Sequence, residues 1–252
     1  MTAERTGVAA LSRYAPRYAV QIGVPSGSEW LRADHLLEPD GPALTELLKR
    51  DHDASGHTSA HANALSLISF YAGRAPAAAL LLWALEGRVL DVRPHNLWVK
   101  PNDGHGLAAI AIRSARFLPG GLRTLYDVVL TDHLLPLAAE LHRRTRAGVR
   151  QLHGGVAAGC AMGFCAASRE QETVPLRHLL ERWQTFVAQA PGGLARLGEV
   201  AEAGGKLVYL RNTCCLYYSS TNGANTLCGS CCLTPREERL AAYEAGRPIL
   251  TV

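Results

Sequence analysis

Five of the seven cysteines of this 252-residue chain lie in one short segment, residues 214–232, which we call the cysteine window. The window reads Cys-Cys, a twelve-residue spacer, and then Cys-Gly-Ser-Cys-Cys. Cysteines that serve only as small hydrophobic core residues would not be concentrated in this way. Thiolates gathered in a short, turn-rich segment can converge on one metal centre. We therefore expect the chemistry of this protein to lie in the window.

The spacing within the window favours a centre with two irons over a single zinc. Two residues separate Cys228 from Cys231, which lets both sulfurs turn onto one metal. Cys214 and Cys215 are adjacent, and because neighbouring side chains normally diverge, they need an unusual backbone turn to serve one centre. Zinc sites usually pair two C-x-x-C knuckles, whereas a cluster of two irons takes one thiolate pair per iron. The polar spacer, residues 216–227, holds a turn that returns the chain to the site.

We expect four metal ligands: Cys214, Cys215, Cys228 and Cys231. Cys231 fits the two-residue spacing, and Cys232, the alternative fourth ligand, is expected to pack instead. The pattern favours a centre with two irons, with structural zinc as the alternative.

The window also resembles a known motif. Residues 211–218, Arg-Asn-Thr-Cys-Cys-Leu-Tyr-Tyr, and residues 227–233, Leu-Cys-Gly-Ser-Cys-Cys-Leu, resemble the C-terminal motif of the ferric siderophore reductases, the FhuF-like family. In that family, Cys-Cys, a spacer and Cys-x-x-Cys hold a [2Fe–2S] cluster. The spacer has ten residues in the best-known members and twelve here. A weaker resemblance covers residues 134–154, where His153-Gly154-Gly155 stands in place of a Trp-Gly-Asn-like turn.

The resemblance implies a cytosolic enzyme that reduces siderophore-bound Fe(III) by one electron and releases Fe(II). Siderophores hold Fe(III) through hard anionic oxygens, and Fe(II) is softer and less charged, so reduction weakens the complex. The implied partners are a ferric siderophore, with the hydroxamate type as one candidate, and an external electron donor such as a ferredoxin or an NAD(P)H-dependent reductase. The chain has no G-x-G-x-x-G after a strand and no P-loop, which favours an external donor.

Two readings from other classes of protein stay open. The first is a zinc-stabilised binding module without redox activity, which would be colourless and hold one zinc. The second is an iron–sulfur redox sensor without reductase activity, whose cluster would change a partner interaction.

Other residues of chemical interest have simpler interpretations. His57 and His61, four apart, form a possible metal pair, but surface positions on a helix are the favoured reading. Four arginines lie close together in the sequence: Arg143, Arg144, Arg146 and Arg150. The favoured interpretation of this basic group is a solvated helix face. The alternative is an electropositive rim for an anionic siderophore or an acidic electron donor. Cys160 and Cys165 are expected to be buried small hydrophobic residues.

Composition narrows the class of protein. The net charge is +4, and the positive residues form no run and no interleaved aromatic pattern, which argues against nucleic acid as a partner. The most apolar stretch, residues 75–85, is about half of the length that a bilayer needs. No targeting segment is evident at the N-terminus. We expect a cytoplasmic protein without a membrane span.

These patterns predict the elements that position the window. Helices are expected over residues 42–48, 59–72, 76–87, 125–144 with Pro136 as a kink or break, 146–167, 174–188 and 234–246, and strands over 18–23, 88–92, 96–100, 107–113 and 206–211. Residues 146–167 are rich in Gly and Ala, which would let another backbone approach closely. The expected fold class is α+β: a mostly helical body with a small antiparallel sheet, residues 1–205, followed by a C-terminal [2Fe–2S]-binding subdomain, residues 206–252.

Overall fold

The computed structural model describes Val8, Leu11 and residues 18–170, 174–221, 223 and 226–246. The fold class is α+β, and helices predominate, as expected from the sequence. The α-helices are α2 (Pro42–Ser55), α3 (Ala60–Ala72), α4 (Ala77–Glu86), α5 (Leu122–Tyr126), α6 (Leu135–Thr145), α7 (Val149–Glu170), α8 (Leu176–Ala188) and α9 (Arg236–Glu244). The strands are β1 (Val20–Ile22), β2 (Leu31–Arg32), β3 (Val89–Leu90), β4 (Leu97–Pro101), β5 (Leu107–Ile112), β6 (Phe117–Leu118), β7 (Gly198–Ala203) and β8 (Lys206–Arg211).

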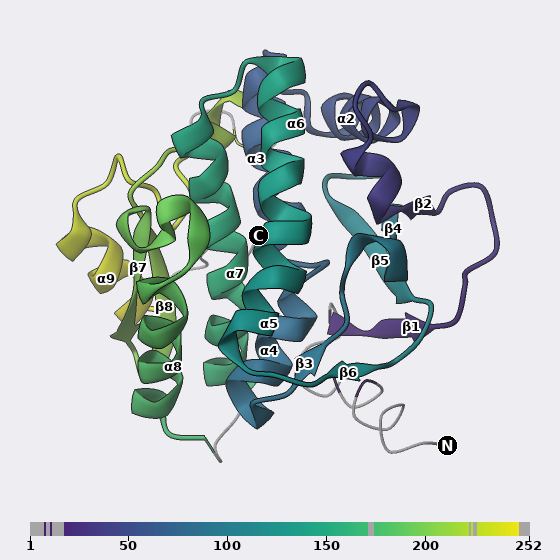
Figure 1. Ribbon diagram of the computed structural model, residues 1–252. Helices are drawn as coiled ribbons and strands as arrows, with labels where there is room; N and C mark the ends of the chain where they lie inside the picture. The colour runs from purple at the N-terminus through teal and green to yellow at the C-terminus, as the bar shows by residue number, and fades with distance from the viewer. Residues whose placement is uncertain are drawn as a thin grey trace.

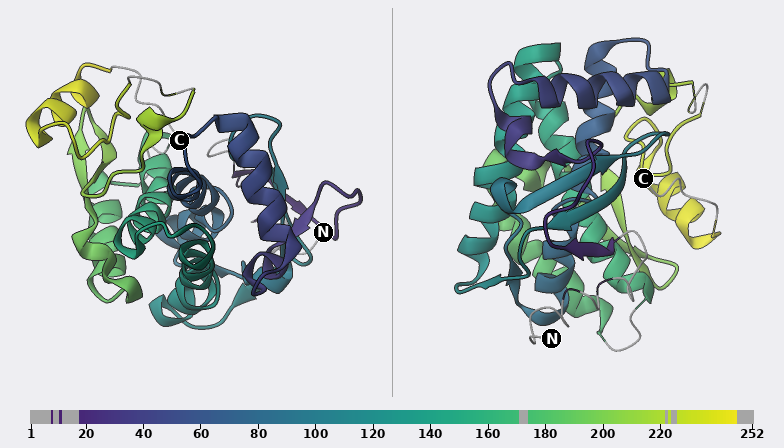
Figure 2. Two further views of the ribbon diagram at one scale, coloured as in Figure 1. Left: turned by 90° about the horizontal axis from the view of Figure 1, so that it is seen from above. Right: turned by 90° about the vertical axis from the view of Figure 1, so that its right-hand side faces the viewer.

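The helices form the middle of the molecule, with β structure on two opposite sides. The four-stranded sheet and α2 lie on one side, and the β7–β8 hairpin with α8 and α9 lies on the other (Figures 1 and 2). The sheet has the order β1-β5-β4-β2. Its β1–β5 pairing is parallel and its other pairings are antiparallel. The sheet is therefore mixed, whereas the sequence predicted an antiparallel sheet.

Glycines on α7 let this helix lie very close to α3 and α4. A Cβ atom on Gly155 would lie 2.9 Å from Ser69 Oγ, and one on Gly159 would lie 2.6 Å from the backbone nitrogen of Gly73. Side chains at these positions would force the backbones apart, because real Cβ contacts are not this short. The expected close approach of another backbone to the Gly- and Ala-rich helix is confirmed.

The predicted break at Pro136 takes the form of a widened helix. Between α5 and α6 the chain forms a π-helix, Asp127–Leu134, in which the Leu135 N–H bonds to Leu130 O, five residues back. Proline has no N–H and its ring clashes with the carbonyl of the preceding turn. The strain is absorbed by π-type bonding just before Pro136, so the helix axis continues into α6.

The cysteine window follows the β7–β8 hairpin, of which the sequence patterns predicted only the second strand, β8. β7 and β8 pair antiparallel, and the chain turns between them at Gly204 and Gly205, both with positive φ. Helix α9 packs on the hairpin, where Tyr243 joins Val208 and Leu210 in a small second core. The boundary predicted between residues 205 and 206 falls in the turn of this hairpin, and the division into two domains stays a prediction.

One helical stretch, Ala60–Glu86, which spans α3 and α4, is long and apolar enough to cross a membrane. Of its apolar window, 89% is buried inside the protein, where α7 covers it. The core helices of a water-soluble fold pass the same test of length and composition. The expected lack of a membrane span therefore stays a prediction.

Candidate metal centre

The adjacent cysteines sit on the unusual turn that two neighbouring ligands require. Leu216, directly after Cys215, has φ 56° and ψ 24°, a left-handed conformation that is rare for residues other than Gly, Asn and Asp. The turn brings the N–H of Leu216 to 3.4 Å from Cys214 Sγ. A left-handed Leu costs about 1–2 kcal/mol, so the surrounding structure must hold it in place.

The four predicted ligands are neighbours in space. Cys215 Sγ lies 4.0 Å from Cys228 Sγ, and Cys231 shares hydrogen bonds with Cys214 and Cys228. Each member of the Cys-Cys pair thus meets one member of the C-x-x-C knuckle. Within the described part of the chain, no three His, Cys, Asp or Glu side chains already surround a single point as metal ligands would.

The pKa values of the thiols reflect this pairing. The hydrogen bond with Cys228, followed by burial, raises the pKa of Cys215. The hydrogen bond with Cys231 lowers the pKa of Cys214 and raises that of Cys231 itself. For Cys232 burial is the main cause of a raised pKa, and its sulfur takes part in no thiol hydrogen bond with the described residues. The choice of Cys231 over Cys232 as the fourth ligand stays a prediction.

Backbone donors around the thiols suit a metal–thiolate centre. The N–H groups of Leu216, Tyr217 and Leu233 point at Cys214, Cys215 and Cys231 respectively. Such N–H···S bonds stabilise thiolates and tune iron–sulfur centres. Two buried polar atoms near the window, Arg211 Nη2 and Thr213 Oγ1, have no hydrogen-bond partner among the described residues. The donor set thus fits a [2Fe–2S] cluster, and it also fits a zinc site with four thiolates.

The spacer of the window is docked on the loop between α2 and α3. Its Thr221 N–H donates to Ser55 O at 3.0 Å, and its Ser219 Oγ lies 3.3 Å from Nδ1 of His57. Burial, followed by the charge of His105, lowers the pKa of His57 to about 4, so His57 is neutral near pH 7. Exposed His61 instead lies 3.4 Å from Ser59 Oγ. The surface-helix interpretation is therefore wrong for His57, which is buried in the loop before α3, and is confirmed for His61, which is exposed on α3.

Sequence patterns gave no sign of a second polar cluster beside this dock. Ser66 Oγ lies 2.9 Å from His105 Nε2, and His105 Nδ1 lies 2.8 Å from Asp51 Oδ1. The order Ser-His-Asp is that of a hydrolase triad, but Ser66 is 2% exposed and lies within α3. A substrate carbonyl has no approach to such a hydroxyl. The cluster instead fastens the turn between β4 and β5 to α2 and α3, since Asp51 also accepts the N–H of Gly106.

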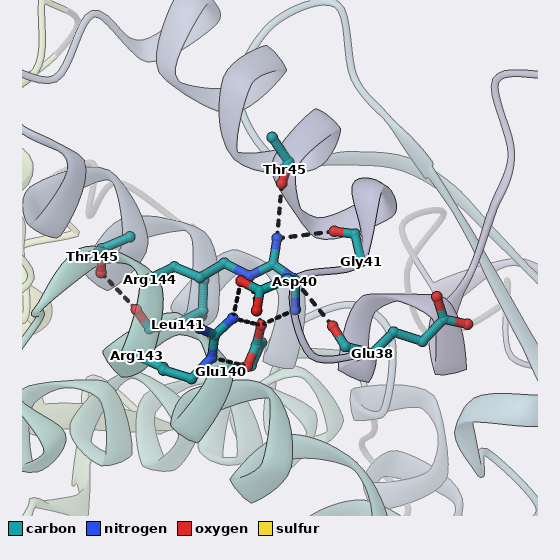
Figure 3. Close-up of polar contacts among 9 residues, drawn as sticks. All are labelled: Glu38, Asp40, Gly41, Thr45, Glu140, Leu141, Arg143, Arg144 and Thr145. Carbon is teal, nitrogen blue, oxygen red and sulfur yellow. Dashed lines mark hydrogen bonds and ion pairs between the residues drawn. The ribbon is translucent and has the colours of Figure 1, made fainter.

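Two of the four arginines considered as an electropositive rim are bound within the protein. Figure 3 shows Arg143 and Arg144 converging on Glu140. Arg143 also donates to Asp40, and Arg144 donates to the carbonyls of Glu38 and Gly41. Hydrogen bonds from Arg143, reinforced by those from Arg144, lower the pKa of Glu140 to about 2. These two guanidinium groups join α6 to the segment before α2, whereas Arg146 and Arg150 are exposed.

The two remaining cysteines, Cys160 and Cys165, are 0% and 7% exposed within α7. They are buried small residues, as expected from the sequence. Burial raises the pKa of the Cys160 thiol, which keeps it protonated and unreactive.

Comparison with models of known protein families gives no match, and no curated protein matches the chain. The resemblance of the cysteine window to the ferric siderophore reductases therefore rests on its own residues.

Proposed function

We propose that this chain is a ferric siderophore reductase with a [2Fe–2S] cluster held by Cys214, Cys215, Cys228 and Cys231. The observation that carries the proposal is the spatial grouping of the Cys-Cys pair with the C-x-x-C knuckle, closed by the 4.0 Å approach of Cys215 and Cys228. When bound, the cluster supplies one electron to siderophore-held Fe(III), and the Fe(II) product is held less tightly.

The residues of the window have distinct parts in this proposal. The left-handed turn at Leu216 presents both adjacent thiols to one centre. The N–H donors of Leu216, Tyr217 and Leu233 disperse thiolate charge and thereby favour metal binding over protonation. Docking of Thr221 on Ser55 fixes the spacer and so fixes the distance between the two halves of the motif.

The outer face of the window suits contact with a substrate. Of the large hydrophobic side chains that are exposed in the described residues, three belong to the window or directly follow it: Tyr218, Leu227 and Leu233. Apolar side chains around partly exposed thiols offer a surface on which a ferric siderophore can rest within electron-transfer reach. We place the reaction in the cytoplasm, with a ferredoxin or an NAD(P)H-dependent reductase as the electron donor.

The first test is the visible absorption spectrum of anaerobically purified protein, before and after dithionite and then after a ferric trihydroxamate siderophore. We expect a red-brown protein that bleaches with dithionite and regains its colour as Fe(II) is released. A cluster that dithionite bleaches but the siderophore does not reoxidise would favour the redox sensor. A colourless protein with one equivalent of zinc, a metal that the same four thiols fit, would favour the binding module.

Two matched variants test the ligand assignment. Cys231→Ser removes a thiol that is grouped with Cys214 and Cys228. Because the cluster needs all four ligands, we expect the variant to lose roughly nine-tenths or more of the cluster absorbance. Cys232→Ser removes a neighbouring thiol outside that group and should keep the spectrum. Loss of the spectrum in Cys232→Ser together with its retention in Cys231→Ser would reverse the assignment.

A further inference from the structure

Arg211 is a buried cation directly beside the cysteine window. It is the last residue of β8 and is 3% exposed. Its Nε donates to Thr213 O at 3.2 Å, and its Nη1 donates to Ser69 Oγ on α3 at 3.3 Å. Its Nη2 is buried and has no hydrogen-bond partner among the described residues. The guanidinium therefore faces the interior with part of its bonding capacity unused.

The charge balance of Arg211 differs from that of the arginines that pair with buried carboxylates. Arg93 and Arg116 pair with Asp91, and Arg143 and Arg144 pair with Glu140. No carboxylate of the described chain forms an ion pair with Arg211, whose contacts are to a carbonyl and a hydroxyl. Guanidinium stays protonated in proteins, and a buried charge without a counter-charge is strongly unfavourable.

Arg211 is hydrogen-bonded to residues that directly neighbour the predicted ligands. Its Nε donates to the carbonyl of Thr213, the residue before Cys214, and its backbone N–H donates to Ser230 O at 3.2 Å, between Cys228 and Cys231. Arg239, 8% exposed, adds a second cation behind it and donates to the carbonyls of Arg211 and Ser230. Two buried guanidinium groups thus lie beside the window, and no carboxylate of the described residues forms an ion pair with either of them.

We propose that Arg211 is the counter-ion of a metal–thiolate centre formed by the window cysteines. Four thiolates around one divalent cation keep two net negative charges, and so do four thiolates around an oxidised [2Fe–2S] core. The buried guanidinium compensates one of these two charges from the protein side. This inference rests on the part of the proposed function that has the cysteines bind a metal, and it is independent of iron and of the siderophore.

The test is Co²⁺ binding to the reduced, metal-free full chain under anaerobic conditions, followed by thiolate-to-cobalt absorption with a competing chelator. Arg211→Gln should bind Co²⁺ at least tenfold more weakly, which corresponds to about 1.4 kcal/mol. Arg211→Lys keeps the charge and should stay within about threefold of wild type. The control is Arg182→Gln, which removes a guanidinium that bonds to the carbonyls of Trp83 and Ala84, and it should change the affinity less than about twofold.

Thermal unfolding separates a counter-ion from a structural residue. Without metal, Arg211→Gln should unfold at or above the temperature of wild type, because it removes an uncompensated buried charge. With saturating Co²⁺ it should gain less stability than wild type. A variant that is destabilised equally with and without Co²⁺ overturns the proposal, since that result marks a purely structural role.

The other outcomes are equally decisive. Wild-type affinity in a folded Arg211→Gln, or equal weakening in Arg211→Gln and Arg211→Lys, overturns the assignment of charge compensation while leaving the reductase proposal intact. Failure of the siderophore reaction with normal Co²⁺ binding overturns the reductase proposal alone. Wild-type protein that does not bind Co²⁺ overturns both.

Discussion

The Glu140 carboxylate holds two parts of the chain together, and it accepts a hydrogen bond from Nε of Arg143 at 2.8 Å. It also accepts from Nη2 of Arg143 at 2.7 Å, from Nε of Arg144 at 2.6 Å and from the N–H of Asp40 at 3.2 Å. Asp40 itself has φ 57°, a left-handed conformation that this bond helps to hold. Since Glu140 is 8% exposed, solvent screens these interactions less than those of surface ion pairs.

Glu140→Gln should therefore destabilise the protein by about 2 kcal/mol at pH 7, because two guanidinium groups lose their anionic acceptor. The folded pKa, about 2, lies below the ordinary value of 4.5, so the stabilisation is present above pH 4.5 and is lost as the pH falls toward 2. Urea unfolding at pH 7 and pH 3 measures this, and the gap between wild type and variant should narrow at pH 3. The control is Glu46→Gln in the exposed pair with Arg50, which should cost less than about 0.5 kcal/mol.

At the level of single residues, the sequence predicted the four thiols but not the long-range contacts that position the window. The spacing of cysteines is a local pattern and can be read directly. Ser69 and His57, which contact Arg211 and Ser219, lie 142 and 162 positions earlier in the chain. Long-range contacts of this kind leave no periodic signal, so the buried environment of the window was beyond sequence reasoning.

Among the elements, helix α7 depends on its glycines for close packing against α3 and α4. A Cβ on Gly163 would lie 3.1 Å from the carbonyl oxygen of Ala77, so the close approach continues from α3 to the first turn of α4. A helix normally gains about 1 kcal/mol when Gly is replaced by Ala. Here the space for that methyl group is filled by the backbone of the neighbouring helix.

Gly159→Ala should reverse the usual preference and destabilise the protein by about 2 kcal/mol, because its Cβ meets Ala72 and the backbone of Gly73. The measurement is equilibrium unfolding in urea. Gly104→Ala is the matched control, since its Cβ finds nothing closer than Asn102 Nδ2 at 3.7 Å, and it should change stability by less than about 0.5 kcal/mol. Equal effects of the two substitutions would contradict the packing argument.

Several helix ends lie at the glycine and capping residues from which they were predicted. Gly87 ends α4 with φ 70°, and Ser59 caps α3 through a bond to the Ala62 N–H, both where helix ends were predicted. Helix α2 continues to Ser55, beyond the predicted end at residue 48, because Gly56 with φ 62° provides the actual stop. Strand β7 was missed since all of its residues except Val200 are Gly, Ala or Glu, which are weak strand formers, and pairing with β8 determines its structure.

Across the whole molecule, the core contains one neutral histidine, His133, that links stability to pH. His133 in the π-helix is fully buried, with Nε2 2.7 Å from Tyr71 Oη and Nδ1 3.2 Å from Val92 O. A carbonyl only accepts, so Nδ1 carries the proton and Nε2 accepts from the tyrosine hydroxyl. Burial lowers the pKa of His133 to about 4.

The free energy of unfolding should therefore fall as the pH drops from 6.5 to 4. In this range His133 is protonated in the unfolded chain but stays neutral in the folded protein. One such proton corresponds to about 1.4 kcal/mol per pH unit. Urea unfolding of wild type and His133→Gln at pH 7.5, 6 and 5 checks this: the amide keeps a donor and an acceptor but does not titrate, so the slope should be shallower by about one proton. His57, whose pKa is also lowered to about 4, contributes equally to both proteins. Parallel slopes would refute the role of His133.

The fold class followed from helical periodicity and the strand signals, but the global arrangement did not. Parallel pairing of Val20 with Ile110 joins segments 90 residues apart, and the strand signals at either segment are the same for parallel and antiparallel partners. The β7–β8 hairpin crosses the predicted domain boundary for a similar reason, since its pairing is a property of both strands together.

The docking of the window has a consequence for biosynthesis. Ser69 on α3 is translated 142 positions before its partner Arg211, so at about 5–20 residues per second the ribosome reaches that partner roughly 7–30 s later. Helices α3, α4 and α7 have time to assemble first, because helical packing forms within milliseconds. The nascent helical body therefore exposes the polar groups of Ser55, His57 and Ser69 until their partners Thr221, Ser219 and Arg211 have been translated. Chaperones would meet this protein as a folded body with one unfinished edge.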